Sequence, residues 1–271
     1  RAPPARTAPR GAGFFEEAKA WRAWLLRAVA GSPSQAQIMY GVRGERLMTE
    51  IEIDWLAGYE ASRPVRVGNG AAQQLQLDVY GEVTSALYQA HVGGLNHDTD
   101  AWSVQRLLVT HLEKIWQRPD QGIWEIRGEP RHFTYSKMMA WVAVDAAVRS
   151  VEQFGQPGPP AHWRELRQKM HDEVCRIGFN AKRNAFVQSE GSTELDASLL
   201  RMPIVGFLPA HDPRVPGTVE AIGRELSVDG LIARYQTASA VDGLPPGEGA
   251  FLACSFWYAD NLFLQGRREE A

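Results

Sequence analysis

Residues 137–149 read KMMAWVAVDAAVR, and residues 249–264 read GAFLACSFWYADNLFL. Both segments are apolar on nearly every side when they are drawn as helices. A helix that is apolar all round is expected to be buried all round, inside a larger helical assembly. The two segments therefore predict an inner layer of helices.

A second, amphipathic kind of helix alternates with the first. Residues 161–177 carry charged side chains on one face and apolar ones on the other, namely Trp163, Leu166, Met170, Val174 and Ile177. Residues 14–29, 100–117 and 214–226 have the same character, and residues 72–92 are intermediate. The alternation predicts outer helices packed against inner ones.

Strand signals are short and few. Residues 37–42 and 49–54 are predicted to pair as a hairpin, and residues 185–188 to form another short strand. The fold class predicted from the residues is therefore all-α.

The connections between these helices alternate in length. Those from an inner to an outer helix are short, at residues 93–98, 156–160 and 209–213. Those from an outer to an inner helix are long, at residues 31–70, 118–132, 179–193 and 227–247. In a ring of helix pairs this arrangement places every long loop at one end, where rigid scaffolds usually carry their function.

Composition restricts the class of protein. A hydrophobic content of 44% with nine Trp suffices for the core of one large domain. The net charge of −3 argues against nucleic acid as a partner, because phosphate binding requires a basic excess. No apolar run reaches the roughly 18 residues of a membrane span, so no membrane partner is predicted. Cys175 and Cys254 provide no disulfide framework, which favours a reducing, cytoplasmic location.

The segment GIWEIRGEPRHFTYSK, at residues 122–137, contains the best candidate for a catalytic group. Glu125 directly follows Trp124, and a carboxyl group against an indole is partly desolvated, which favours its protonated form and suits it to donate a proton. Arg127 lies close behind and can orient hydroxyl-rich groups. A surface loop with an aromatic anchor is the plainer alternative. The position of this segment in one of the long loops favours a site.

Two other long loops contribute donors and aromatic faces. The first contains Arg63 and Arg66, and the last contains Arg234, Tyr235 and Glu248. Aromatic platforms and planar donors are how neutral polyols such as sugars are bound. Either arginine of the first loop could instead hold that loop in place, and Glu248 could cap its helix.

Other patterns point away from particular chemistries. Asp78 and Glu82 lie one helical turn apart, too close to act on a bond from two sides, so a structural or solvated role is expected. The histidines show no zinc-ligand spacing with the two cysteines, and no metal or cofactor is predicted. The sequence contains no dinucleotide-binding, P-loop or nucleophile-elbow pattern.

Several motifs resemble signatures of glycoside hydrolase family 15. They are ASRPVRVGN at 61–69, QLQLDVYGEV at 74–83, DQGIWEIRG at 120–128, PRHFTYSKMMAWVAVD at 130–145, STELDASLLRMPIVGFLP at 192–209 and VDGLPPGEGAFLACSFW at 241–257. The bacterial branch resembles glucoamylases, glucodextranases and trehalases. The resemblance implies an (α/α)6 toroid that hydrolyses α-glucosidic bonds with inversion, and a substrate that is an α-linked oligosaccharide or trehalose.

The resemblance also implies roles for individual residues. Glu125 falls on the general acid of the family, and Trp124 lines the first sugar subsite. Arg234 resembles an arginine that binds a sugar hydroxyl, with Tyr235 beside it. The loop 63–69 resembles a substrate-facing loop.

Two parts of the family pattern do not occur in the sequence. An aromatic-Arg-Asp segment is expected before the helix at 14–29, where residues 1–13 read RAPPARTAPRGAG and are expected to be disordered or aberrant. The general base is expected in a motif beyond residue 271. Residues 14–271 are therefore predicted to form part of the catalytic domain, an incomplete toroid with weak activity or none.

Two alternatives remain open. One is a non-catalytic sugar-binding or interaction module derived from the same fold. The other, ranked last, is a toroid cyclase or prenyl-transfer enzyme, which would need acidic magnesium clusters or a zinc site.

Overall fold

The computed structural model describes residues 14–29, 31–95, 98–236 and 250–271. The predicted disordered segment 1–13 and Glu248 lie outside these residues. The described helices are α2 (Phe15–Ala28), α3 (Asp78–Val92), α4 (Thr99–Ile115), α5 (Thr134–Phe154), α6 (Pro160–Gly178), α7 (Arg201–Ile204), α8 (Arg214–Glu225) and α9 (Leu252–Leu264). Short 3-10 helices are η2 (Pro33–Gln35), η3 (Tyr59–Ala61), η4 (Gly70–Gln73) and η5 (Ala197–Leu200).

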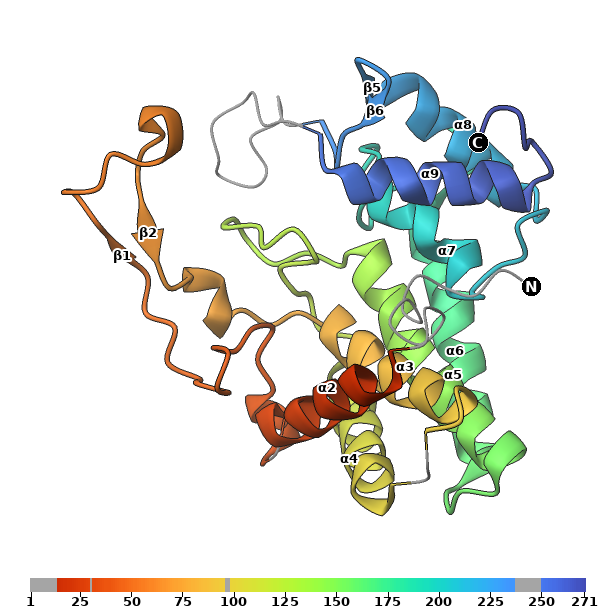
Figure 1. The fold of residues 1–271 in the computed structure, drawn as a ribbon. Helices are drawn as coiled ribbons and strands as arrows, with labels where there is room; N and C mark the ends of the chain where they lie inside the picture. Colours follow the sequence, from red (N-terminus) through yellow and green to blue (C-terminus); the bar gives the residue numbers. More distant parts are fainter. Residues whose placement is uncertain (1–13, 30, 96–97, 237–249) are drawn as a thin grey trace.

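The helices form an open arc of inner and outer elements (Figure 1). Along the inner side α5 packs against α3 and η5, and α9 packs against η5 and α7. On the outer side α4 covers α3 and α5, α6 covers α5, and α8 covers η5 and α9. The predicted fold class, an incomplete toroid of alternating inner and outer helices, is confirmed.

The helix limits follow from local chemistry. Asp98 caps α4 by accepting hydrogen bonds from the N–H groups of Asp100 and Ala101, which satisfies donors that have no partner within the helix. Helix α5 ends at Gly155 in the left-handed conformation (φ 66°), where a side chain would be disfavoured. The predicted apolar face of 161–177 is buried along the whole of α6.

One guanidinium joins four of the inner elements. Arg201 of α7 donates from Nη1 to Glu82 Oε1 of α3 at 2.8 Å and to the hydroxyl of Tyr135 of α5. Its Cζ also lies 5.4 Å from the ring centroid of Trp257 on α9. Because these partners come from three other helices, Arg201 fixes the inner side of the arc from its centre.

The strands are short two-residue pairs. Strand β1 (Ile51–Glu52) pairs antiparallel with β2 (Arg66–Val67), β3 (Phe179–Asn180) with β4 (Ala185–Phe186), and β5 (Ser227–Val228) with β6 (Leu231–Ile232). The predicted strand at 185–188 is thus confirmed at its first two residues.

The predicted hairpin between 37–42 and 49–54 is wrong. The partner of β1 is β2, which comes later in the chain, and residues 37–42 form no strand. The side-chain amide of Gln37 instead donates to the carbonyl oxygens of Arg46 and Ala72. Side-chain hydrogen bonds therefore hold this segment against Arg46 and η4 in place of a backbone ladder.

The expectation that both apolar helices are buried all round holds for only one of them. Helix α5 is buried along most of its length, whereas α9 exposes Leu252, Phe256 and Phe263 by 58%, 69% and 49%. Helix α9 lies on one flank of the arc in Figure 1, so one of its sides has no neighbour among the described residues. Within those residues, none of the helices has the length and apolar character that crossing a membrane would require.

Candidate active site

The loop 118–132 is held closed at its base. Asp120 and Arg131 exchange two backbone hydrogen bonds of 2.9 and 2.8 Å. The carboxylate of Asp120 accepts the N–H of Leu77 at the start of α3, and the buried ammonium of Lys137 donates to the carbonyl oxygens of Trp116 and Arg118. The loop is therefore fastened to α3, α4 and α5 at its base.

A tight turn at the tip of this loop carries Trp124 and Glu125. The N–H of Glu125 donates to the carbonyl oxygen of Gly122 at 3.2 Å, and that of Ile126 to Gln121 at 3.3 Å. Gly122 has a φ of 69°, and a Cβ atom there would lie 2.9 Å from the ring of Phe133. Because both the conformation and the space exclude a side chain, glycine is required at this point of the turn.

Glu125 has a strained backbone and an oriented side chain. Its φ is 55°, a left-handed conformation that costs on the order of 1–3 kcal/mol for a residue with a side chain and that clusters at functional sites. Its Oε2 accepts a hydrogen bond of 3.2 Å from Nδ2 of Asn69. Oδ1 of Asn69 in turn accepts the N–H of Ala71 at 2.8 Å, which fixes the amide so that its donor faces Glu125.

Glu125 lines a cavity of about 700 Å³. Three of the four long loops that the alternation of loop lengths predicted at one end contribute to its walls, together with the start of α9. The loop at residues 179–193 contributes no lining residue. The lining residues are Glu50, Arg66, Gly68, Asn69, Ile123, Trp124, Glu125, Arg127, Arg234, Phe251, Ala253 and Trp257.

Trp124 forms an aromatic wall of this cavity. The Cζ atom of Arg234 lies 5.2 Å from its ring centroid, close enough for a cation–π interaction. Phe251 meets the same ring edge-on at 5.9 Å, and Tyr235 lies 6.3 Å away. An indole face beside a planar cation and a carboxyl group suits a ligand that has both apolar ring faces and hydroxyl groups.

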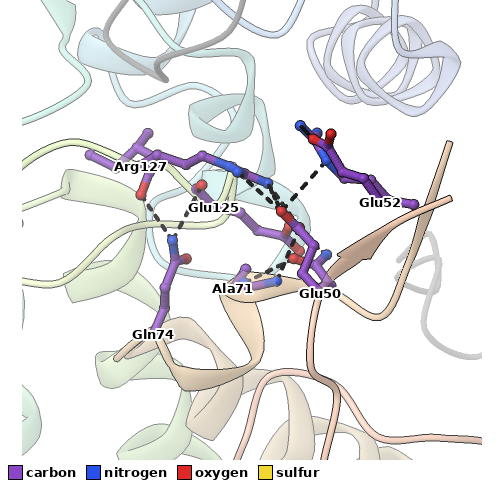
Figure 2. A network of polar contacts seen from close by, with 10 residues as sticks. Glu50, Glu52, Ala71, Gln74, Glu125 and Arg127 are labelled. Carbon is purple, nitrogen blue, oxygen red and sulfur yellow. Dashed lines mark hydrogen bonds and ion pairs between the residues drawn. The ribbon is translucent and has the colours of Figure 1, made fainter. Parts of the chain in front are cut away.

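A second carboxylate, Glu50, forms salt bridges with two arginines of the cavity lining (Figure 2). It forms salt bridges with Arg127 at 3.0 Å and with Arg66 at 3.6 Å, and it accepts the N–H of Gly70 at 3.1 Å. The hydrogen bond from Gly70 and the guanidinium of Arg127 lower the pKa of Glu50. Glu50 is thus held ionised, and it orients Arg66 and Arg127, two of the four arginines that the sequence assigned to substrate binding.

The remaining predicted site residues lie elsewhere. Arg63 donates to the carbonyl oxygen of Asp54 and does not line the cavity. Tyr235 is buried, contacts the ring of Trp124 and does not line the cavity. Glu248 lies outside the described residues. Asp78 and Glu82 are absent from the cavity lining, and Glu82 is bound to Arg201.

Several residues of this region were not identified from the sequence. They are Glu50, Asn69 as a partner of Glu125, Phe251, Trp257 and the buried Asp196, which accepts the indole N–H of Trp124 at 2.9 Å. The local sequence marks two of them, because Asn69 stands between glycines and Asp196 precedes an Ala-Ser pair as a helix cap does. Among the described residues, no group of three or more His, Cys, Asp or Glu side chains could hold a metal ion.

An arc of paired helices, with an aromatic cavity that holds a carboxyl group at its loop end, is the architecture of the helical glycosidases. A glycosidase variant solved in complex with glucose superposes with a TM-score of 0.72 at 21% identity, over 98% of this chain and 69% of that chain. The glucoamylase of Saccharomycopsis fibuligera superposes with a TM-score of 0.54 at 12% identity, over 69% and 47%. At these identities the likeness is one of fold.

The family follows from the sequence match. The model of glycosyl hydrolases family 15 matches residues 7–269, and the chain belongs to this family. It is similar to curated trehalases. The identity is 43% with the trehalase of Mycolicibacterium smegmatis, over 86% of this chain and 35% of that protein. It is 38% with the trehalase of Thermoplasma acidophilum, over 90% and 41%. The chain therefore spans less than half the length of these two relatives.

Proposed function

We propose that the chain forms part of the catalytic domain of an inverting hydrolase of α-glucosidic bonds, with trehalose as the favoured substrate. Glu125 donates a proton to the glycosidic oxygen, and a water molecule attacks the anomeric carbon from the opposite face. Trp124 and Arg234 hold the glucose ring against this acid. The choice of trehalose over a starch-type oligosaccharide rests on the names of the curated relatives.

The observation that carries the proposal is the conformation of Glu125. A residue with a side chain occupies a left-handed turn position next to an indole, and its carboxyl group is oriented by Asn69 toward a cavity of about 700 Å³. Strain of this kind persists only where the surrounding structure imposes it. Glycine would adopt this turn without that strain, so a role for the carboxyl group accounts for a glutamate at this position.

Glu50 is not assigned as the general base. Its two salt bridges and its hydrogen bond from Gly70 occupy the carboxylate with cations and a backbone donor. A base for inversion must instead face a water molecule, with the two carboxyl groups roughly 6.5–9.5 Å apart. The resemblance places the general base in a motif that the 271 residues do not contain, and we assign none of the described carboxylates to this role.

The test is glucose release from trehalose and maltose by the 271-residue chain at high protein concentration. Glu125→Gln is expected to lower turnover by about 10²–10⁴-fold, because it removes the proton donor, while trehalose affinity measured by calorimetry changes little. The matched control is Glu129→Gln, an exposed carboxyl group of the same loop that does not line the cavity. Turnover that survives Glu125→Gln would contradict the assignment.

The same measurements address the alternative, a non-catalytic sugar-binding module. Trehalose or glucose binding by the unaltered chain, without product release, would favour that alternative. Its binding should then depend on Trp124 and Arg234 but not on Glu125.

A further inference from the structure

Asp196 lies behind the cavity wall and is surrounded by hydrogen-bond donors. Its side chain is almost fully buried, in the loop before η5. Oδ1 accepts the indole N–H of Trp124 at 2.9 Å, and Oδ2 lies 3.1 Å from the same nitrogen. Ser198 donates to Oδ1 from its backbone N–H at 2.8 Å and from its hydroxyl at 2.6 Å. The side-chain amide of Gln188 donates to Oδ2 at 3.3 Å.

This set of donors is what a buried carboxylate requires. A buried charge is costly unless hydrogen bonds or counter-charges compensate it, and Trp124, Ser198 and Gln188 all donate to Asp196. Burial raises the pKa of Asp196, whereas the donors from Ser198 and Trp124 act in the opposite direction. Both oxygens of the carboxylate therefore accept hydrogen bonds from neighbouring residues, and one of the donors is the indole of the cavity wall.

Ala197, the residue after Asp196, binds the backbone of Arg234, the second side chain of the cavity wall that contacts Trp124. The N–H of Ala197 donates to the carbonyl oxygen of Arg234 at 2.8 Å. Two consecutive residues thus fix the side chain of Trp124 and the backbone of Arg234, whose guanidinium lies over the Trp124 ring. Trp124 and Glu125 share one tight turn, so the angle of the indole and the position of the carboxyl group are coupled through a single peptide unit.

We propose that Asp196 is a positioning residue of the active site: it orients the indole of Trp124 and thereby aligns the sugar-binding wall with Glu125. The proposal rests on the proposed function, because it takes the Trp124 face as the surface on which the sugar ring lies. Asp196 itself does not line the cavity and touches no substrate. A small misplacement of such a wall is enough to lower catalysis by about 10²-fold.

The test is a double-mutant cycle in the 271-residue chain, with Asp196→Asn, Trp124→Phe and the double variant. Phenylalanine keeps an aromatic face but has no N–H to donate. Asp196→Asn removes the charge and one of the two oxygens near the indole nitrogen. It is expected to weaken trehalose binding, and to lower kcat/KM where turnover is measurable, by about 5–20-fold, because a hydrogen bond to an ionised acceptor is roughly twice as strong as one to a neutral acceptor. In the Trp124→Phe background it is expected to change either quantity by less than about threefold, because the contact is already absent.

The cycle separates positioning from a merely structural role. If Asp196 served only the fold, Asp196→Asn would have the same effect in both backgrounds, and that result would overturn the proposal. The control is Asp98→Asn, another aspartate that accepts backbone N–H groups at a helix start, far along the chain from the cavity residues. It is expected to leave trehalose affinity unchanged.

A readout without sugar distinguishes failure of this proposal from failure of the proposed function. The indole N–H resonance of Trp124 is identified by its loss in Trp124→Phe, and it should shift in Asp196→Asn but not in Asp98→Asn. If no sugar binds and the resonance still shifts, the proposed function fails and the orienting contact stands. A resonance that does not move in Asp196→Asn overturns the positioning role, whatever the chain binds.

The Asn variant has a route to a folded state. Oε1 of Gln188 is buried and has no hydrogen-bond partner within the described residues, so rotation of that amide would offer an acceptor to the new NH2 group. Ser198→Ala is the milder companion, because it removes one donor to Oδ1 and leaves the contact with Trp124 in place. It is expected to shift the same resonance in the opposite direction and by less, because the loss of a competing donor leaves Oδ1 a better acceptor for the indole N–H. No shift at all would count against the proposal.

Discussion

Helices α5 and α9 share an apolar character but have very different surroundings. Both are apolar on nearly every side, yet 16 of the 21 residues of α5 are buried and only three of the 13 residues of α9 are. Helix α5 lies between α3, α4, α6 and η5, whereas α9 contacts η5, α7, α8 and β6 and leaves Leu252 and Phe256 in contact with solvent.

The difference shows that an apolar pattern records which surface a helix could bury, and that neighbours decide how much of it is buried. The contribution to stability scales with the apolar area removed from water. Substitutions of the same kind should therefore have unequal effects on α5 and its neighbour α3 and on α9 and its neighbour α8. Three pairs of variants test this inequality.

The largest expected difference is between truncations of Met139 on α5 and Phe256 on α9. Met139 is fully buried and Phe256 is 69% exposed. Met139→Ala should lower the free energy of unfolding by about 2–5 kcal/mol, because it leaves a cavity, and Phe256→Ala by no more than about 0.5 kcal/mol, as for most surface changes. Urea denaturation measures both. Equal losses would mean that α9 is as well covered as α5.

The next pair consists of two helical glycines. A Cβ atom at Gly81 of α3 would lie 2.2 Å from the backbone oxygen of Met139, which cannot move without shifting α5. Gly81→Ala should therefore destabilise the fold by about 1–3 kcal/mol through overpacking.

The matched change is Gly223→Ala on α8. The new Cβ atom would lie 2.3 Å from the hydroxyl of Tyr258 on α9, a side chain that is only partly buried and can swing aside. The better helix propensity of alanine, worth about 1 kcal/mol, should offset that movement. Thermal unfolding that ranks the Gly223 variant below the Gly81 variant in stability would contradict the comparison.

The third pair of variants tests a difference in pH dependence. Burial, with the charge of Asp120 second, raises the pKa of Asp78 on α3 from its ordinary 3.8 to about 8. The folded protein then keeps a proton that the unfolded chain releases above its own pKa. The contribution to stability is complete below about pH 4 and is lost as the pH rises toward 8, with a slope of at most about 1.4 kcal/mol per pH unit.

The substitution Asp78→Asn should flatten the fall in unfolding free energy between pH 5 and pH 8. Asp260→Asn on the exposed side of α9 should change that slope less. Asp260 is exposed, and partial desolvation is the one cause that raises its pKa. Chemical denaturation at a series of pH values measures both slopes. An unchanged slope in the Asp78 variant would show that this group does not hold its proton in the folded state.

The candidate site was predictable where its residues are close in sequence. Trp124, Glu125 and Arg127 occupy one loop, and the alternation of loop lengths was enough to bring Arg66 and Arg234 to the same end. The contacts that orient these groups were not predictable. Asn69 and Glu125 are 56 positions apart, Trp124 and Asp196 are 72, and Glu50 and Arg127 are 77. No local period in a sequence encodes such pairs.

The sequence by itself determined where helices form, which of their faces are apolar and where the chain turns, because these properties depend on hydrogen bonds and side-chain spacings within a few residues. The tertiary structure alone decided that β1 pairs with β2, that α9 keeps an exposed side, and that Glu50 and Asp196 orient the walls of the cavity. Those outcomes depend on which distant segments meet, and the free energy of burial or of a salt bridge is set by the partner that the fold supplies.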